Sequence, residues 1–399
     1  MSKAILEGIT VVDMSQIGAG PIASMVLGDM GANVIKIEAP SGDACRLLGP
    51  PFAQEESGIY LSVNRNKKGI ALDFKKPEGV EVIKKLIAKA DIFLESNRPG
   101  VMDRLGLGYE QVREINPQII YVSISGFGQT GPYAQRPGVD GVLQAMGGIM
   151  SVTGEEGRAP VKAGVPATDT ITGYLGTMSI LGALIYRDRH KQGQKVELSL
   201  LDSIIALQVM SMGMYLISGE NPKRYGSHAP YAAPNGVIKT KDGYVMIAAY
   251  HDKKWKSLCE IINRQDLLTN HKFETNPARV DNRDELMQIL EASFCEKTSQ
   301  TWLELLTEAD IICAPINTYS DLVEHPQVKA NNMIIEVPHP LIGKLKMVGF
   351  APKYSLSPMQ ANFPPPLFGE HTEEILQNAG YTAKQINVLL DKGVAIKRG

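Results

Sequence analysis

The first half of the chain alternates short runs of β-branched and aliphatic residues with longer amphipathic stretches. Ile9 to Asp13 and Asn33 to Ile37 have the length of strands, and Pro21 to Met30 between them has the length of a helix. This alternation is typical of an α/β domain with a mostly parallel sheet, because parallel strands need a crossover between them. We therefore expect a large α/β domain, with ligands bound beyond the carboxyl ends of its strands.

A second, smaller domain is expected later in the chain, where the composition shifts to Gly, Pro, Asn and Ser. We expect the large domain to comprise residues 1–200 and 331–399, because the C-terminal helix should pack back on it. Residues 201–225 are expected to form a linker, and residues 226–330 a small α+β domain. The predicted fold class is thus α/β with a large and a small domain.

Charge and residue usage exclude several classes of function. The 41 basic and 43 acidic residues give a net charge of -2 without blocks of like charge, so neither a nucleic acid nor a membrane is an expected partner. The four cysteines form no C-x-x-C pair and the seven histidines no H-E-x-x-H motif, so we expect no metal site. The N-terminus does not have the pattern of a signal peptide, and a soluble, cytoplasmic protein is expected.

The segment Gly18 to Ala23 fits the G-x-G-x-x-G/A pattern of dinucleotide-binding proteins, and Glu38 supplies an acidic residue after it. In that fingerprint the first glycine follows the strand at once. Here polar residues from Asp13 to Gln16 intervene, which indicates a longer loop. A nicotinamide-dependent oxidoreductase is therefore one alternative, and a purely structural strand-to-helix turn is another.

A phosphate-bearing ligand is indicated by a second loop, Asn97 to Gly106. It combines a rigid Arg98-Pro99-Gly100 turn with a second guanidinium at Arg104. Guanidinium groups bind phosphate oxygens in bidentate fashion. Scattered basic side chains are more often solvated surface, so other motifs must decide between these interpretations.

Several motifs in a fixed order decide between these interpretations. The chain resembles the class III CoA-transferases, a family that includes formyl-CoA transferase, carnitine CoA-transferase and the 2-methylacyl-CoA racemases. The resemblance extends from about residue 6 to residue 372. It rests on Ile17-Gly18-Ala19-Gly20-Pro21, Gly31 to Glu38, Gly42-Asp43 with Arg46, Asn64 to Lys68 with Leu72-Asp73, Arg98-Pro99-Gly100, Gly126 to Pro132, and Pro365 to Thr372.

This resemblance implies that Asp169 is the catalytic nucleophile. Its carboxylate would attack the thioester of an acyl-CoA, and a mixed anhydride and an aspartyl-CoA thioester would follow. Without the resemblance, Asp169 would simply be an N-cap for the long helix expected from Thr168 to Arg189. A helix N-terminus would favour the ionised carboxylate, so the two interpretations are compatible.

The resemblance also implies a set of binding residues and partners. It implies a Rossmann-like large domain, no permanently bound cofactor, since CoA and acyl-CoA are substrates, and two subunits that form an interlocked homodimer. Asp140 lies where the family has an acidic residue near the nucleophile, and Arg46 is a candidate ligand of the acceptor's distal carboxylate. The expected CoA contacts are Gly18, Ala19, Leu72, Lys75, Asn97, Arg98 and Arg104.

Two departures from the family patterns bear on the reaction. The racemases use a histidine in a Gly-His-Asp motif as a second base, and here the motif is Gly138-Val139-Asp140, which disfavours a racemase. The oxalate-specific transferases have a run of glycines where this chain has His228 to Gly236. Segments Gly49 to Phe52 and Tyr60 to Lys68 look most like the branch that uses succinyl-CoA and dicarboxylic acids such as glutarate. We therefore expect a CoA-transferase acting on a small dicarboxylate.

Overall fold

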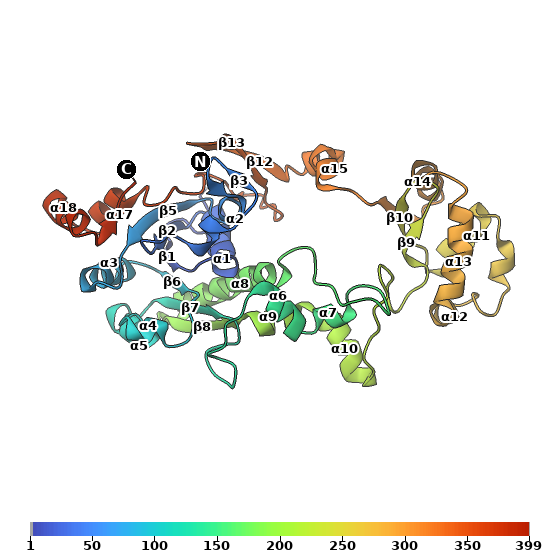
Figure 1. Ribbon diagram of the computed structural model, residues 1–399, viewed down its shortest axis with the longest axis horizontal. Coiled ribbons are helices and arrows are strands. Elements are labelled where there is room, and N and C mark those ends of the chain that lie inside the picture. The colour runs from blue at the N-terminus through green and yellow to red at the C-terminus, as the bar shows by residue number, and fades with distance from the viewer. Residues whose placement is uncertain (1–2, 399) are drawn as a thin grey trace. The chain divides into compact units, whose positions relative to one another are not determined.

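The computed structural model describes residues 3–398 and divides into two compact units (Figure 1). The first unit contains residues up to Ile149, then Ala163–Met212, and then residues from Gln327 onward. The second unit contains Met150–Lys162 and Gly213–Pro326. The chain therefore leaves the first unit and returns to it, and the short segment Met150–Lys162 goes with the second unit although we expected it in the large domain.

Residues 201–225, expected to be a linker, contain most of helix α9 (Leu200–Leu207) and all of α10 (Val209–Ser218). The two helices meet at an angle of 76°. Within residues 3–398 no single helix is long and apolar enough to cross a membrane, whereas this bent pair meets the requirement in length and composition alone.

A seven-stranded sheet organises the first unit, and its strand order is β14-β5-β2-β1-β6-β7-β8. Every neighbouring pair is parallel except β14 and β5, which are antiparallel. Apart from β14, the order is 3-2-1-4-5-6 in the sequence of the strands, which is that of doubly wound Rossmann folds. The strands are β1 Thr10–Met14, β2 Asn33–Glu38, β5 Lys67–Leu72, β6 Ile92–Glu95, β7 Ile120–Ser125, β8 Gln194–Ser199 and β14 Ala395–Ile396.

Helices cover both faces of this sheet, and each face has its own hydrophobic core. On β1, Val12 and Met14 belong to one core and Val11 to the other, because successive side chains of a strand point to opposite faces. The first core is completed by α3 (Pro77–Ile87), α4 (Val101–Arg104), α5 (Tyr109–Ile115), α17 (Thr372–Asn378) and α18 (Ala383–Asp391). The second is completed by α1 (Ala19–Asp29), α6 (Asp140–Met146), α8 (Ala167–His190) and α9.

Close packing of α1 on α8 brings the N-terminal ends of these two helices together. A Cβ atom on Gly173 would lie 2.6 Å from Ile22 Cγ2, and one on Gly176 would lie 3.3 Å from Ala23 Cβ. Only glycine allows this approach at Gly173. A Cβ atom on Gly182, by contrast, would have nothing within 4 Å of it.

The second unit has a three-stranded antiparallel sheet, in the order β11-β10-β9, and a core of its own. The core is built around Trp255, Trp302, Phe273 and Phe294, which are almost completely buried. The unit contains β9 Asn235–Lys239, β10 Tyr244–Ala248, β11 Ile312–Pro315, α11 Asp252–Ile261, α12 Asn276–Asp281, α13 Arg283–Phe294, α14 Ser299–Glu308 and α15 Tyr319–Glu324. The α+β composition expected of this part of the chain is thus observed.

The remaining elements are short. Two-stranded antiparallel sheets are formed by β3 with β4 and by β12 with β13. These elements are β3 Phe52–Ala53, β4 Glu56–Ser57, β12 Ile334–His339, β13 Gly343–Val348, α2 Gly58–Val63, α7 Ile149–Val152, α16 Pro326–Ala330 and the 3-10 helices Ala44–Leu47 and Gln265–Leu268.

Candidate active site

The loop between β1 and α1 lies at the point where the strand order of the sheet reverses, between β1 and β6. Four residues, Ser15 to Gly18, separate the last residue of β1 from the first residue of α1, so the loop is longer than that of a dinucleotide fingerprint. The backbone N–H of Gln16 donates to Ser96 Oγ at 3.0 Å, which ties this loop to the loop after β6. In open α/β sheets this crevice is where ligands bind.

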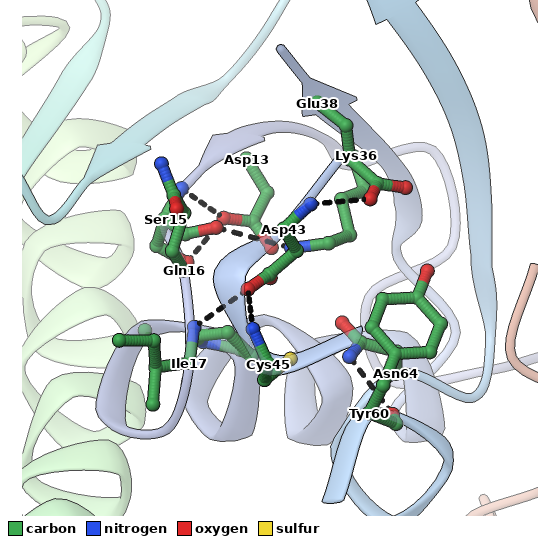
Figure 2. Close-up of polar contacts among 12 residues, drawn as sticks. Asp13, Ser15, Gln16, Ile17, Lys36, Glu38, Asp43, Cys45, Tyr60 and Asn64 are labelled. Carbon is green, nitrogen blue, oxygen red and sulfur yellow. Dashed lines mark hydrogen bonds and ion pairs between the residues drawn. The ribbon is translucent and has the colours of Figure 1, made fainter. Parts of the chain in front are cut away.

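A buried ion pair holds the β1–α1 loop in place (Figure 2). Lys36, in the middle of β2, is completely buried and donates to Asp43 Oδ2 at 2.7 Å and to the carbonyl of Ser15 at 3.0 Å. The other oxygen of Asp43 accepts the backbone N–H of Ile17 at 3.1 Å. Burial lowers the pKa of Lys36, but Asp13, Asp43 and Glu38 more than offset this and leave it raised. Lys36 is therefore a fixed positive charge beside the β1–α1 loop.

A second buried charge, Asp13, fixes the start of the same loop. Its carboxylate accepts hydrogen bonds from the backbone N–H of Ser15 and from the Ser24 hydroxyl, and Lys67 Nζ lies 3.3 Å away. Burial raises the pKa of Asp13, yet Lys67 and Lys36 bring it below its usual value. Because the desolvation of each charge is offset only by its partners, the network specifies one arrangement of the loop.

The loop carries a strained residue next to the site. Ile17 has a φ of 70°, in the left-handed region that β-branched residues rarely adopt. Such a conformation costs on the order of 1–3 kcal/mol and persists only where surrounding contacts hold it. Here the Asp43 carboxylate, itself held by Lys36, binds the Ile17 N–H group. The buried network thus maintains the backbone conformation that presents Gly18.

Asp169 meets this loop directly. A Cβ atom placed on Gly18 would lie only 2.4 Å from Asp169 Oδ2, so the carboxylate packs against the bare main chain of Gly18. Asp169 is not the N-cap that it had been expected to be. Helix α8 begins at Ala167, with Pro166 at the N-cap position, and Asp169 is the third residue of the helix. The carboxylate therefore stands beside the first turn of α8 and the start of α1.

The pKa of Asp169 is raised to about 6 by burial and, secondarily, by the negative charge of Asp140. The helix N-terminus had been expected to keep the carboxylate ionised, and burial opposes that tendency. At neutral pH, however, a group with this pKa is still about nine-tenths ionised. In residues 3–398 no hydrogen bond is made to the Asp169 carboxylate. It is thus an unpartnered and partly desolvated anion, as a nucleophile should be.

Asp140 organises the turn from which Asp169 projects. Its Oδ1 accepts the backbone N–H of Thr168 at 2.8 Å and lies 3.4 Å from that of Asp169, and its Oδ2 accepts from Gln144 Nε2 at 2.7 Å. Asp140 therefore satisfies free N–H groups at the start of α8, as a capping residue does. Val139, in the position of the racemase histidine, is the N-cap residue of α6 and is exposed.

The N-terminus of α1 offers donors at the same place. Gly18 is the N-cap residue, and within the described part of the chain the N–H groups of Gly18, Ala19 and Gly20 donate to no protein acceptor. Unpaired N–H groups at a helix N-terminus bind negatively charged oxygen atoms. A substrate oxyanion formed beside Asp169 would find such donors here.

The residues expected to contact CoA follow strands β1, β6 and β5, whose carboxyl ends lie at the same edge of the sheet. Gly18 and Ala19 follow β1, and Asn97, Arg98 and Arg104 follow β6; the side chains of both arginines are exposed. Leu72 is the last residue of β5 and completely buried, so only its main chain is available to a ligand.

Lys75, a few residues after Leu72, has an exposed side chain. Of the expected CoA contacts, Gly18 is the residue whose main chain the Asp169 carboxylate packs against. Among residues 3–398 no cluster of three or more His, Cys, Asp or Glu side chains could hold a metal ion.

Arg46 differs from its expected role as an acceptor ligand. Its guanidinium forms a bidentate pair with Glu38, at 2.7 and 2.8 Å, and also binds Glu56 at 3.0 Å. Its Cζ lies 3.6 Å from the centre of the Tyr60 ring. These contacts use most of its donors, because an arginine has five N–H groups and the carbonyl of Pro366 takes a further one. We therefore do not include Arg46 in the acceptor site.

The sequence analysis did not identify the buried charges Lys36, Asp13 and Lys67 as parts of the site. A signal for Lys36 is present in the sequence, since it interrupts an otherwise apolar strand, Asn33–Glu38. A charge in the middle of a buried strand needs a partner, so such a residue points to an organised polar network.

The first unit thus combines a doubly wound fold with the Asp169 carboxylate at the edge of the sheet where such folds bind ligands. Comparison with known proteins gives the family. The family model described as CoA-transferase family III matches residues 6–372. The chain therefore belongs to CoA-transferase family III, and it is a class III CoA-transferase, an enzyme of acyl-CoA metabolism.

Individual relatives agree with this assignment. The succinyl-CoA:glutarate CoA-transferase of Homo sapiens is 42% identical over 391 residues, which cover 98% of this chain and 89% of that protein. The succinate–glutarate CoA-transferase of Agrobacterium fabrum is 35% identical and matches 94% of this chain and 95% of its own length. A crystal structure of a CAIB/BAIF family protein from Brucella suis superimposes with a TM-score of 0.86 at 36% identity, covering 95% of this chain and 100% of that one.

Proposed function

We propose that this enzyme transfers CoA from succinyl-CoA to a small dicarboxylic acid through covalent intermediates on Asp169. The observation that carries the proposal is the Asp169 carboxylate, which has no hydrogen-bond partner within residues 3–398 and lies against Gly18 at the start of α1. The choice of substrates rests on the relatives named for transfer between succinyl-CoA and glutarate.

The reaction proceeds in four acyl-transfer steps. The Asp169 carboxylate attacks the thioester carbonyl of the donor, and the C–S bond breaks. This step releases CoA thiolate and forms a mixed anhydride between Asp169 and the succinyl group. The thiolate attacks the Asp169 carbonyl and releases succinate, which leaves an aspartyl-CoA thioester. The acceptor carboxylate attacks that thioester and expels CoA thiolate again. The thiolate finally attacks the acceptor acyl group, releasing the new acyl-CoA and restoring Asp169.

Each step passes through an oxyanion, and the free N–H groups of Gly18, Ala19 and Gly20 are the donors that we assign to stabilise it. Loss of one such donor commonly costs about 3 kcal/mol of transition-state stabilisation. The exposed guanidinium groups of Arg98 and Arg104 are assigned to the phosphates of CoA. We assign Lys75 and Asn97, together with the main chain of Leu72, to contacts with the same ligand.

Trapping of the covalent intermediates tests this mechanism. The protein is mixed with succinyl-CoA and then treated with borohydride or hydroxylamine, and its tryptic peptides are analysed by mass spectrometry. Modification is expected only in the peptide from Ala163 to Arg187, which contains Asp169. An unmodified protein that still transfers CoA would refute the mechanism. A screen in which only monocarboxylates accept CoA would refute the choice of acceptor.

We also propose that the enzyme is a homodimer, as the family resemblance implies. Helix α8 exposes a row of apolar side chains, Tyr174, Met178 and Ile185, each more than half exposed, which a second copy would cover. Light scattering should give a mass twice the 43.5 kDa of the chain, and Met178→Glu should lower it. A monomeric wild-type protein would refute the dimer. The cytoplasmic location stays a prediction.

A further inference from the structure

The second unit contains a cleft of about 930 Å³ that the transfer mechanism does not use. Its lining comes from Glu155 and Glu156, from the segment that follows α10, from strands β9 and β10, from the end of α12 and from α13, all within the second unit. The lining is predominantly polar and includes Tyr225, His228, Lys239 and Arg283. A polar cavity of this size is large enough for a small ligand with several hydrogen-bonding groups.

Arg283 is the unusual member of this lining. The residue is only 7% exposed, and its Nε is buried without a hydrogen-bond partner. Its Nη2 donates to the carbonyls of Ala229 and Pro230, at 2.7 and 3.1 Å, and its Cζ lies 4.7 Å from the centre of the Tyr225 ring. No carboxylate within residues 3–398 forms an ion pair with it. A buried guanidinium without a counter-ion is costly, and a bound anion would remove that cost.

Carboxylates also line the cleft, and their exposure matters. Six carboxylates line it, those of Glu155, Glu156, Asp281, Asp284, Glu285 and Glu291, and all six side chains are exposed, so water already solvates their charges. Only the charge of Arg283 is both buried and unpaired. The lining thus has one position at which a negative charge is strongly favoured, and Lys239, exposed on β9, adds a second positive charge to the same wall.

His228 lies beside Arg283 and supplies a neutral hydrogen-bonding group. Its pKa is lowered, first by burial and then by the positive charge of Arg283. The imidazole packs against strand β9 with Nδ1 toward the main chain of Gly236, where a Cβ atom on Gly236 would stand 2.0 Å from Nδ1. No side-chain hydrogen bond is made by His228 within the described chain, so we take Nε2 as the nitrogen that a ligand can reach. A glycine at position 236 is therefore what makes room for this side chain.

We propose that this cleft is a binding site for a small oxyanion, a carboxylate or a phosphate group, held by Arg283 and His228. The guanidinium provides charge and parallel donors, and the imidazole provides one further hydrogen bond. The site goes beyond the proposed transfer reaction, because it uses none of the residues assigned to that chemistry.

The test follows His228 by NMR in the full-length protein with labelled histidine, its signals being assigned by comparison with His228→Asn. Sodium phosphate and sodium glutarate are titrated separately, and sodium chloride serves as the control for ionic strength. We expect saturable shifts of the His228 signals with at least one of the two anions and none with chloride. Shifts with phosphate alone identify a phosphate site, and shifts with glutarate alone identify a carboxylate site.

Variants separate binding from folding. Arg283→Lys should weaken binding at least about tenfold, because lysine keeps the charge but not the bidentate geometry. The matched control is Arg279→Lys, since Arg279 is equally buried in the second unit but donates to the carbonyls of Ala233, Phe273 and Tyr250 and does not line the cleft. The control should bind like the wild type.

If Arg283→Lys fails to fold, Gly236→Ala provides the second test, because its methyl group would displace the His228 ring and leave Arg283 in place. This variant too should weaken binding. The absence of saturable shifts with both anions would overturn the proposal, as would equal affinity in Arg283→Lys. Transferase activity is not the readout, so either result leaves the proposed function untouched.

Discussion

The main chain of Gly18 lies so close to the Asp169 carboxylate that a methyl group on Gly18 would stand 2.4 Å from Oδ2. Gly18→Ala must therefore move either the loop or the carboxylate. A displacement of about 1 Å at a reacting group can lower the rate about 100-fold, and we expect a loss of this size in kcat/KM. Steady-state kinetics with succinyl-CoA and glutarate would measure it.

The matched control is Gly182→Ala in α8, where nothing lies within 4 Å of the added methyl group. Alanine is a better helix former than glycine, so this variant should gain about 0.5–1 kcal/mol of stability at unchanged activity. An active Gly18→Ala enzyme would show that the close contact is not needed for catalysis.

The acid limb of the pH profile should report the ionisation of Asp169. Its pKa of about 6 reflects burial first and the charge of Asp140 second, and only the ionised carboxylate is nucleophilic. We expect kcat/KM to fall below about pH 6, and Asp140→Asn to shift that limb to lower pH because one cause of the shift is removed. A limb that stays in place in Asp140→Asn would contradict this assignment.

Asp169→Asn should abolish transfer and at the same time stabilise the protein. Since the folded state raises the pKa of this acid, ionisation of Asp169 destabilises the fold at pH values above about 6. The gain in Asp169→Asn should approach 3 kcal/mol at most, as an order of magnitude, at neutral pH, and should vanish as the pH falls below the unfolded pKa. Thermal melting across the pH range measures this.

Asp242→Asn is the control of opposite sign, because hydrogen bonds from Ser299 lower the pKa of that exposed carboxylate. It should show no gain at neutral pH. Equal melting temperatures for Asp169→Asn and the wild type at every pH would contradict the predicted desolvation.

The buried pair of Lys36 and Asp43 should be strongly coupled. Lys36→Met leaves a buried carboxylate without its partner and is expected to cost about 3–5 kcal/mol. The double variant with Asp43→Asn should lose less than the sum of the single losses. Removing the exposed pair of Lys76 with Asp73, at 3.7 Å, should cost less than about 1 kcal/mol. Urea denaturation would compare the wild type, Lys36→Met, Asp43→Asn and the double variant. Strictly additive losses of stability would count against the network.

Arg46→Gln tests whether this residue binds the acceptor or supports the fold. From its contacts with Glu38 and Glu56 we expect a loss of stability of about 3–5 kcal/mol, with no selective change in the KM for glutarate. A selective rise in that KM, with the KM for succinyl-CoA unchanged, would restore Arg46 to the acceptor site.

Much of the first unit could be predicted from hydrophobic periodicity. Strands buried on both faces are nearly continuous apolar runs, and helix α8 was expected within one residue at each end. The errors have physical causes. Strand β5 begins at Lys67, a completely buried charge, and a sequence pattern does not reveal this start because charged residues are usually exposed.

The candidate site was less accessible to such reasoning. Asp169 was identified through the family resemblance, whereas its place in the first turn of α8 depends on where the helix begins, and helix ends are the least predictable part of an element. The buried pair of Lys36 and Asp43 joins residues of a strand and of a loop, and its stability depends on desolvation that no local pattern reports.

The antiparallel strand β14 has a consequence for how the molecule is made. Its Ala395 pairs with Leu72, so the edge of the large sheet joins segments from opposite ends of the chain. The core of the second unit, by contrast, is drawn from residues between Ala233 and Ile311. During synthesis the second unit can complete its core while the large sheet still waits for its last strand. Assembly of the catalytic half therefore finishes late, after the inserted unit has acquired its structure.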